Sequence, residues 1–379
     1  MKFPFRTRAA PSAAKLISAT LRQAFAAAGL ARASHPLRRM AENLPRARAE
    51  DRGGRADKAA PPAAQPPGTF HTHQHIGPAG SRAYKLYVPA APPRGARPLL
   101  VMLHGCTQSA DDFAAGTQMN RLAEAHGLLV VYPEQTAQAN PSKCWNWFKP
   151  QDQQRGAGEP ALMAGIVAQV AQAHGVDPQR VFVAGLSAGA AMAVVLGATY
   201  PETFAAVGAH SGLPYGSAHD IPSALSAMKG GRSHLPGLQA ASGGPASPPH
   251  PAHPGHQAHA PMPVPVIVFH GDRDHTVQAR NGAQIVQQAL AAQPGLQART
   301  ETGATPAGRR YTRTVHSTPA GQAHVESWVL HGAGHAWAGG HASGSFTDAQ
   351  GPDASAAMLR FFMAHPQPQP HPQPNSASA

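Results

Sequence analysis

One serine in this chain lies between two glycines. Residues 181–190 read Val-Phe-Val-Ala-Gly-Leu-Ser-Ala-Gly-Ala, so that Ser187 follows an apolar run and precedes a helix-like run of small residues. This pattern is typical of a nucleophile elbow, where a strand turns directly into a helix and Gly185 and Gly189 relieve crowding at the turn. The alternative is a serine that caps an ordinary helix. We predict that Ser187 is a catalytic nucleophile.

A serine hydroxyl needs a base to attack, and the chain order expected after an elbow is serine, acid, histidine. Two carboxylates follow the next apolar run, at Asp272 and Asp274, and two histidines follow the last one, at His331 and His335. We predict Asp274 as the acid, because it lies further round its loop, whereas Asp272 could order the turn. We predict His335 as the base, because glycines around it let the loop curl over the sheet edge, whereas His331 lies close to the strand end.

The oxyanion that forms during acyl transfer needs N–H donors fixed in advance. The first predicted donor is the amide of Ala188, directly after the serine. The second is the amide of Cys106, in the stretch Leu103-His-Gly-Cys-Thr-Gln108, where Gly105 permits close approach of the backbone.

The chain has two cysteines, Cys106 and Cys144, and both fall on loops at the predicted catalytic edge. They could be buried free thiols, but we expect a disulfide, which would be worth about 4 kcal/mol and would clamp the oxyanion loop. A disulfide favours an extracellular or periplasmic location. No clear signal peptide accompanies it, because Lys15 and Arg22 interrupt the only apolar stretch near the start.

The elements that must position these residues alternate along the chain. Continuous apolar runs separated by helical patterns indicate an α/β domain with a largely parallel sheet and helices on both faces, over residues 69–365. The strand-like runs are residues 83–89, 98–104, 128–132, 180–184, 205–209, 264–269 and 325–330, and the helix-like ones are 112–125, 159–174, 188–198 and 281–292.

Three segments are predicted to be disordered: a basic leader and linker over residues 1–68, an insertion over 231–262 and a tail over 366–379. The insertion carries four histidines among repeated prolines, which prevent a helix from gathering them, so we predict no metal site. These histidines are His250, His253, His256 and His259.

The net charge of +12 is concentrated in the leader, since residues 1–58 hold 13 Lys and Arg against 4 Asp and Glu. The remainder is nearly neutral, which argues against specific nucleic-acid binding. Ile17, Leu21 and Phe25 form one stripe of a possible amphipathic helix, which could lie on a membrane or a hydrophobic granule.

At these residues the chain resembles the short-chain-length polyhydroxyalkanoate depolymerase and esterase family of α/β-hydrolases. The oxyanion loop precedes the serine, which is similar to the order of the type 1 catalytic domain. The resemblance covers about residues 70–365 without the insertion and rests on Leu103-His-Gly-Cys-Thr-Gln108, Cys144-Trp-Asn-Trp-Phe148, Gly156-Ala-Gly-Glu-Pro160, Gly185-Leu-Ser-Ala-Gly189, His270-Gly-Asp-Arg-Asp274 and Gly334-His-Ala-Trp337.

The resemblance implies hydrolysis of poly(3-hydroxybutyrate) or related short-chain polyesters without a metal or an organic cofactor. It places the nucleophile, acid and base on Ser187, Asp274 and His335, the oxyanion amides on Cys106 and Ala188, and the disulfide on Cys106–Cys144. No C-terminal substrate-binding domain is recognisable, so oligomers, amorphous polymer or small esters are the expected substrates. Feruloyl and acetylxylan esterases share these motifs and are the alternative. A non-catalytic granule-binding protein is a distant one.

Four tryptophans are present. We predict that Trp145, Trp147 and Trp337 line an apolar cleft for the acyl chain, with a packing role as the alternative. Trp328, in the last strand, is predicted to be core.

Overall fold

The computed structural model describes residues 66–230 and 262–367. Almost all of the leader, nearly the whole insertion and most of the tail lie outside these ranges. The predicted amphipathic stripe and the four histidines of the insertion therefore lie outside the described residues, and those expectations stay predictions. Within the two described ranges, no helix is both long and apolar enough to cross a membrane.

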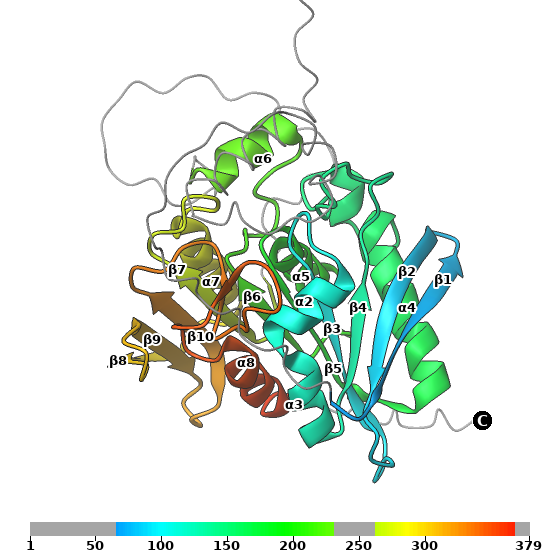
Figure 1. The fold of residues 1–379 in the computed structure, drawn as a ribbon. Helices are drawn as coiled ribbons and strands as arrows, with labels where there is room; N and C mark the ends of the chain where they lie inside the picture. The colour runs from blue at the N-terminus through cyan, green and yellow to red at the C-terminus, as the bar shows by residue number, and fades with distance from the viewer. Residues whose placement is uncertain (1–65, 231–261, 368–379) are drawn as a thin grey trace, which may run out of the picture.

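The described residues form a ten-stranded sheet in the order β1-β2-β4-β3-β5-β6-β7-β10-β9-β8 (Figure 1). Six neighbouring strands, from β4 to β10 in that order, run parallel to one another. Two hairpins extend the sheet with antiparallel pairs at its opposite edges. The strands are β1 (Thr69–Gly77), β2 (Gly80–Val88), β3 (Arg97–Leu103), β4 (Leu129–Pro133), β5 (Val176–Leu186), β6 (Ala206–His210), β7 (Val266–Gly271), β8 (Gln297–Ala304), β9 (Arg310–Ser317) and β10 (Ala323–Leu330).

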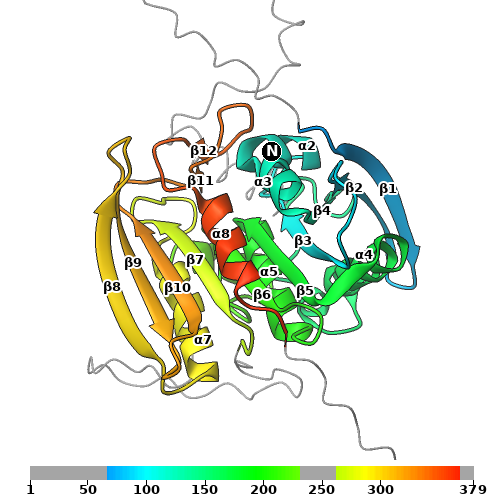
Figure 2. The same cartoon turned by 90° about the horizontal axis from the view of Figure 1, so that it is seen from below.

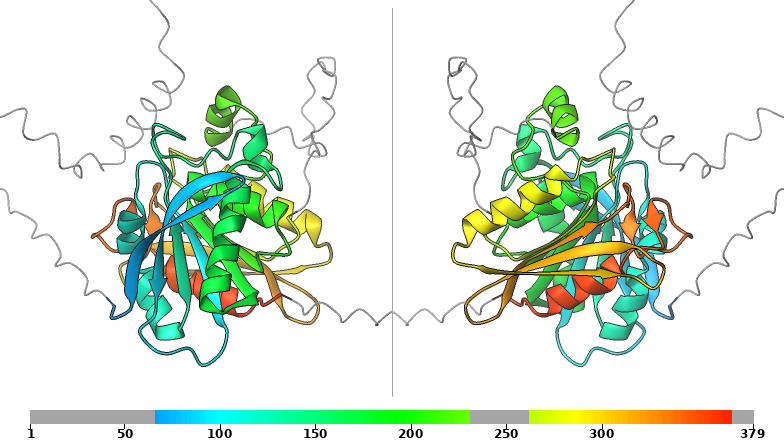
Figure 3. Two further views of the ribbon diagram at one scale, coloured as in Figure 1. Left: turned by 90° about the vertical axis from the view of Figure 1, so that its right-hand side faces the viewer. Right: turned by 90° about the vertical axis from the view of Figure 1, so that its left-hand side faces the viewer.

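Helices cover both faces of the sheet, which explains why the central strands are apolar throughout. One core joins the sheet to α4 (Gly158–His174), α5 (Ala188–Thr199) and α7 (Arg280–Ala292). The other joins it to α2 (Ala110–Thr117), α3 (Met119–His126) and α8 (Ala354–Met363). Figure 2 shows α8 lying across the central strands, and Figure 3 shows α7 and α8 on opposite sides of the sheet.

The predicted α/β-hydrolase architecture is confirmed, with differences at the edges. The helix expected over residues 112–125 is two helices, because Gln118 takes a left-handed conformation (φ 55°) between α2 and α3. The strands β1, β8 and β9 are not among the expected elements, since β1 and β8 are polar and largely exposed and β9 is only partly buried. Three short elements complete the frame: η2 (Pro150–Gln153), α6 (Ile221–Met228) and the small sheet of β11 (Trp337–Ala338) with β12 (Thr347–Asp348).

Candidate active site

The backbone at Ser187 is a sharp, strained turn between β5 and α5. Ser187 has φ 59° and ψ −120°, a region that residues with a side chain rarely adopt and that costs on the order of 1–3 kcal/mol. A Cβ at Gly185 would lie 2.4 Å from the carbonyl carbon of Gly189, and one at Gly189 would lie 2.0 Å from the oxygen of Leu103. Both glycines are therefore required for the turn, as the sequence pattern indicates.

The predicted acid and base lie together at the same sheet edge. His335 Nδ1 donates to Asp274 Oδ2 over 2.7 Å, and Asp274 Oδ1 accepts from the amides of Thr276 (2.9 Å) and Val277 (2.8 Å). Both side chains are buried, with Asp274 2% and His335 6% exposed. Because Nδ1 carries the proton, Nε2 of His335 is left as the acceptor that a general base requires.

Electrostatics keep Asp274 ionised despite its burial. Burial alone would raise its pKa, but the neighbouring His335, His270 and the Val277 amide together lower the pKa to about 2. His270 Nε2 donates to Val277 O (2.8 Å) and lies 3.5 Å from Asp274 Oδ2. Burial lowers the pKa of His270, so this ring is a neutral donor that braces the acid loop.

His210 joins the turn at Ser187 to the segment that carries His335 (residues 331–348, called the base loop), and sequence reasoning missed it. Its carbonyl accepts from the Ser187 amide (2.9 Å), and its Nε2 accepts from the Ala338 amide (3.0 Å). The ring is fully buried and stacks on Trp337, and burial lowers its pKa to about 3. Its place at the end of the run 205–209, like the other site residues, is the signal that could have identified it.

The Ser187 amide and the segment that carries His335 are therefore both hydrogen-bonded to His210, the segment through the Ala338 amide. Ser187 is 7% exposed. In the described part of the chain no hydrogen bond joins Ser187 Oγ to the His335 ring. Such contacts are often long until substrate binds.

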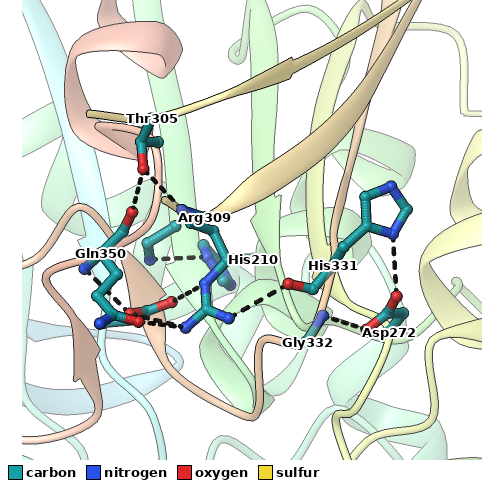
Figure 4. A network of polar contacts seen from close by, with 9 residues as sticks. His210, Asp272, Thr305, Arg309, His331, Gly332 and Gln350 are labelled. Atoms are coloured by element: carbon teal, nitrogen blue, oxygen red, sulfur yellow. Dashed lines mark hydrogen bonds and ion pairs between the residues drawn. The ribbon is translucent and has the colours of Figure 1, made fainter. Parts of the chain in front are cut away.

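The alternative acid and base pair with each other at a separate place. Asp272 Oδ2 accepts from His331 Nδ1 (3.0 Å), and Asp272 Oδ1 accepts from the amide of Gly332 (2.7 Å) (Figure 4). Both side chains are about a third exposed. Asp272 thus orders the turn, as its alternative role required, and holds the start of the base loop.

Arg309, at the turn between β8 and β9, holds both ends of the same loop (Figure 4). Its Nη1 donates to His331 O (3.2 Å), and its Nε donates to Asp348 Oδ2 (3.2 Å). The segment that carries His335 is therefore fixed where it leaves β10 and again at β12. No sequence motif indicated this role for the edge hairpin.

The amide of Cys106 lies in the loop after β3, and three other amides of this loop are hydrogen-bonded. Gly105 N donates to Gln108 Oε1, Thr107 N to Ser142 O and Gln108 N to Gly105 O. The amide of Cys106 makes no hydrogen bond to any described residue. The amide of Ala188 is the first of α5, where helix geometry provides no intrahelical acceptor. Both amides are thus available to an oxyanion.

Cys106 and Cys144 form a disulfide, with 4.2 Å between their Cα atoms. The expected bridge is confirmed. It ties the loop after β3 to the loop after β4, 38 residues along the chain.

The tryptophans require a correction, because two of the three predicted cleft residues are core. Trp145 is 0% exposed and its indole N–H donates to His104 O (3.0 Å). Trp337 is 1% exposed and its N–H donates to Ser355 Oγ (3.0 Å). Trp147 is buried edge-on against Phe148. The indole N–H groups of Trp145 and Trp337 are satisfied internally, which supports the packing alternative for these two side chains.

Across residues 66–230 and 262–367, no group of three or more His, Cys, Asp or Glu side chains is arranged to hold a metal ion.

Comparison with protein families gives one extended match. The model described as Esterase PHB depolymerase matches residues 82–314. Poly(3-hydroxyalkanoate) depolymerase C of Paucimonas lemoignei is 35% identical over 251 residues, which is 66% of this chain and 57% of that protein.

Two other relatives match shorter stretches. Feruloyl esterase B of Neurospora crassa is 38% identical over 120 residues, 31% of this chain and 39% of that protein. Acetylxylan esterase A of Aspergillus oryzae is 35% identical over 119 residues, 31% of this chain and 38% of that protein. The chain thus spans less than two thirds of the length of each of these curated relatives.

Among solved structures, acetyl xylan esterase from Aspergillus awamori is similar with a TM-score of 0.56 and 20% identity, over 78% of this chain and 100% of that one. At this identity the likeness concerns the fold.

Proposed function

The chain belongs to the PHB depolymerase family of esterases, and from this premise we propose that it is a serine carboxylesterase that hydrolyses short-chain poly(3-hydroxyalkanoates) or their oligomers. The observation that carries the proposal is the Asp274–His335 pair, buried at the sheet edge where the strained Ser187 turn lies. A carboxylate that fixes the tautomer of a buried imidazole beside a serine elbow is the arrangement that acyl transfer requires.

In the proposed reaction Ser187 Oγ attacks the ester carbonyl carbon while its proton passes to His335 Nε2. The amides of Cys106 and Ala188 hold the negative charge that develops on the carbonyl oxygen. His335 then gives the proton to the departing alcohol oxygen, which leaves an acyl group on Ser187. Water, deprotonated by His335, releases the hydroxy acid and restores the serine. Asp274 stabilises the imidazolium in both steps.

The substrate class is inferred from the relatives. The match to depolymerase C covers about twice as much of this chain as the matches to the feruloyl and acetylxylan esterases. A polyester or its oligomers is therefore the first choice. A plant cell-wall ester is the second candidate, supported by the identity to feruloyl esterase B, which is slightly higher over a shorter stretch.

Labelling and a substrate panel test these proposals separately. The full chain is treated with a fluorophosphonate and the modified peptide is mapped. We expect modification at Ser187 in the wild type and none in Ser187→Ala. Labelling of another residue would refute the assignment of the nucleophile.

The panel compares 3-hydroxybutyrate dimers and trimers with methyl ferulate and acetylated xylo-oligosaccharides. We expect the highest kcat/KM for the hydroxybutyrate oligomers. Faster turnover of ferulate or acetylxylan would move the substrate assignment to the second candidate while leaving the nucleophile in place.

A further inference from the structure

The motif Gly156–Pro160 has no part in the chemistry described so far, although it carries a buried charge. Glu159, at the start of α4, is 4% exposed, and Asp152 lies beside it at 5%. Arg82, from β2, is also buried near both carboxylates. Buried ionic groups are costly and add little stability compared with apolar residues of the same volume. A cluster of this kind calls for a role other than stability.

Every described hydrogen-bond partner of the Glu159 carboxylate is an N–H donor. Oε2 accepts from the Asn146 amide (2.7 Å), and Oε1 accepts from Asn146 Nδ2 (2.8 Å) and from Gln135 Nε2. Burial, and then Asp152, raises the pKa of Glu159, and these donors act against that rise. The site is thus built to receive a carboxylate, at an electrostatic cost.

Gln135 carries the contact onward to the oxyanion loop. Its side-chain Nε2 also donates to Cys144 O (3.0 Å), next to the disulfide. The backbone N–H of Gln135 donates to His104 Nε2 (3.1 Å). His104 Nδ1 in turn donates to Gly105 O (2.7 Å). Burial lowers the pKa of His104 to about 4, which keeps the ring neutral and able to accept at one nitrogen while it donates at the other.

The Gly105 carbonyl is the last acceptor in this series of hydrogen bonds, and it belongs to the same peptide unit as the Cys106 N–H. Because a peptide unit is planar, fixing the Gly105 carbonyl fixes the direction of that N–H. Glu159 therefore reaches the predicted oxyanion donor by two routes. One passes through Gln135 and His104, and the other passes through Asn146 to Cys144, two residues earlier in the chain, and its disulfide.

We propose that Glu159 is a positioning residue, whose buried carboxylate orients the Cys106 amide toward the oxyanion through Gln135, His104 and the Cys144 loop. This inference rests on the proposed esterase function and deepens it. In this role Glu159 does not contact the substrate. The Cys106 amide that it orients makes the contact with the oxyanion.

The test variant is Glu159→Gln, which keeps the shape of the side chain but replaces one carboxylate oxygen with an NH₂ group that faces the N–H donors of Gln135 or Asn146. Neither side-chain amide can turn round freely to accept from it, because Gln135 Oε1 already accepts from Arg82 Nη1 (2.5 Å) and Asn146 Oδ1 from Asn140 Nδ2 (3.2 Å). We expect kcat for p-nitrophenyl butyrate to fall about 10- to 100-fold, within the effect of losing an oxyanion donor. KM is expected to stay within about threefold.

Glu326→Gln is the matched control. Glu326 is 0% exposed and is bound by Arg313, Arg360 and the Trp328 N–H, none of which belongs to the oxyanion loop. This variant removes an equally buried carboxylate and is expected to change kcat less than about threefold. The melting temperatures of both variants report how much of any effect is general destabilisation.

A second readout separates positioning from mere stability. The inhibition constant of an alkyl trifluoromethyl ketone, which forms a tetrahedral oxyanion on the serine, is measured for the three proteins. In Glu159→Gln it should rise by the same factor by which kcat falls. If kcat and this constant both match those of Glu326→Gln, the proposal is overturned.

Two further outcomes are distinguished. If Glu159→Gln does not fold, Asn146→Ala, which removes one donor to the carboxylate, decides: a several-fold loss of kcat and of ketone affinity supports the proposal, and unchanged values overturn it. If wild-type protein is not labelled at Ser187, the esterase proposal itself fails, independently of Glu159.

Discussion

Asp274→Asn replaces the predicted acid with a side chain of the same shape, and the structure dictates how that side chain must lie. Oδ1 of Asp274 accepts from two backbone amides, those of Thr276 and Val277. An NH₂ group cannot accept there, so the asparagine carbonyl must keep this place. The NH₂ group is then forced toward His335 Nδ1, at the 2.7 Å position of Oδ2.

This orientation reverses the tautomer of the base. His335 Nδ1 must accept from the asparagine, so the proton moves to Nε2, the atom that should take the proton from Ser187. The corresponding exchange in a Ser-His-Asp triad lowers kcat about 10⁴-fold, which is a barrier increase of about 5.5 kcal/mol. We expect a loss of this size for Asp274→Asn, with KM changed by less than about threefold, because Asp274 does not contact the acyl chain in the proposed reaction.

The assay is hydrolysis of p-nitrophenyl butyrate at pH 7–8, with Asp272→Asn as the control. The Asp272 side chain is more than a third exposed and binds His331 and Gly332, so its loss should lower kcat by less than about threefold. Retention of more than about a tenth of the activity by Asp274→Asn, or a larger loss in Asp272→Asn, would refute the assignment of the acid.

Three further predictions concern stability. Ser187→Gly should abolish activity and yet raise the free energy of unfolding by about 1 kcal/mol, because relief of about 1–3 kcal/mol of backbone strain exceeds the entropic cost of glycine. Urea unfolding measures this free energy, and a clear loss of stability would contradict the inferred strain at Ser187. The double variant Cys106→Ser/Cys144→Ser should lose about 4 kcal/mol of stability, the chain-entropy value for a 38-residue separation; an unchanged urea midpoint would rule this out. The pKa of Asp274 is about 2 in the folded protein, below its ordinary value of 3.8. Its contribution, about 2 kcal/mol, is therefore fully present above about pH 4 and is lost as the pH falls toward 2. The stability difference between wild type and Asp274→Asn, measured by urea unfolding from pH 5 to 2, should shrink by that amount, and a constant difference would argue against an ionised Asp274.

The central fold could be predicted because its signals are local. The apolar run of residues 180–184 falls within β5, and the run 264–269 overlaps β7, which begins two residues later. Burial on both faces of a parallel sheet requires such runs, so they are legible in the sequence. The edge strands could not be recognised in this way. β8 is exposed over nearly its whole length, and its pairing with β9 depends on backbone hydrogen bonds that any polar sequence can make.

The tryptophans show where local reasoning fails. A Trp-Asn-Trp segment beside a catalytic loop suggests an apolar lining, since an indole can face a substrate or a core equally well. Trp145 faces the core because a backbone carbonyl, His104 O, lies where its N–H can reach it. That acceptor comes from a loop 41 residues earlier, so the choice was not visible in the segment itself.

The sequence by itself determined the turn at Ser187, since the need for glycine at Gly185 arises from the backbone of Gly189, only four residues away. It also determined the order in which acid and base follow the serine. Only the tertiary structure decided which carboxylate meets which histidine. Asp274 and His335 are 61 residues apart, and they meet because β7 and β10 are hydrogen-bonded neighbours whose loops leave the sheet at one edge. The same two strands also bring Asp272 to His331. Partners across a sheet are set by the strand register, which cannot be read from the sequence of either strand alone.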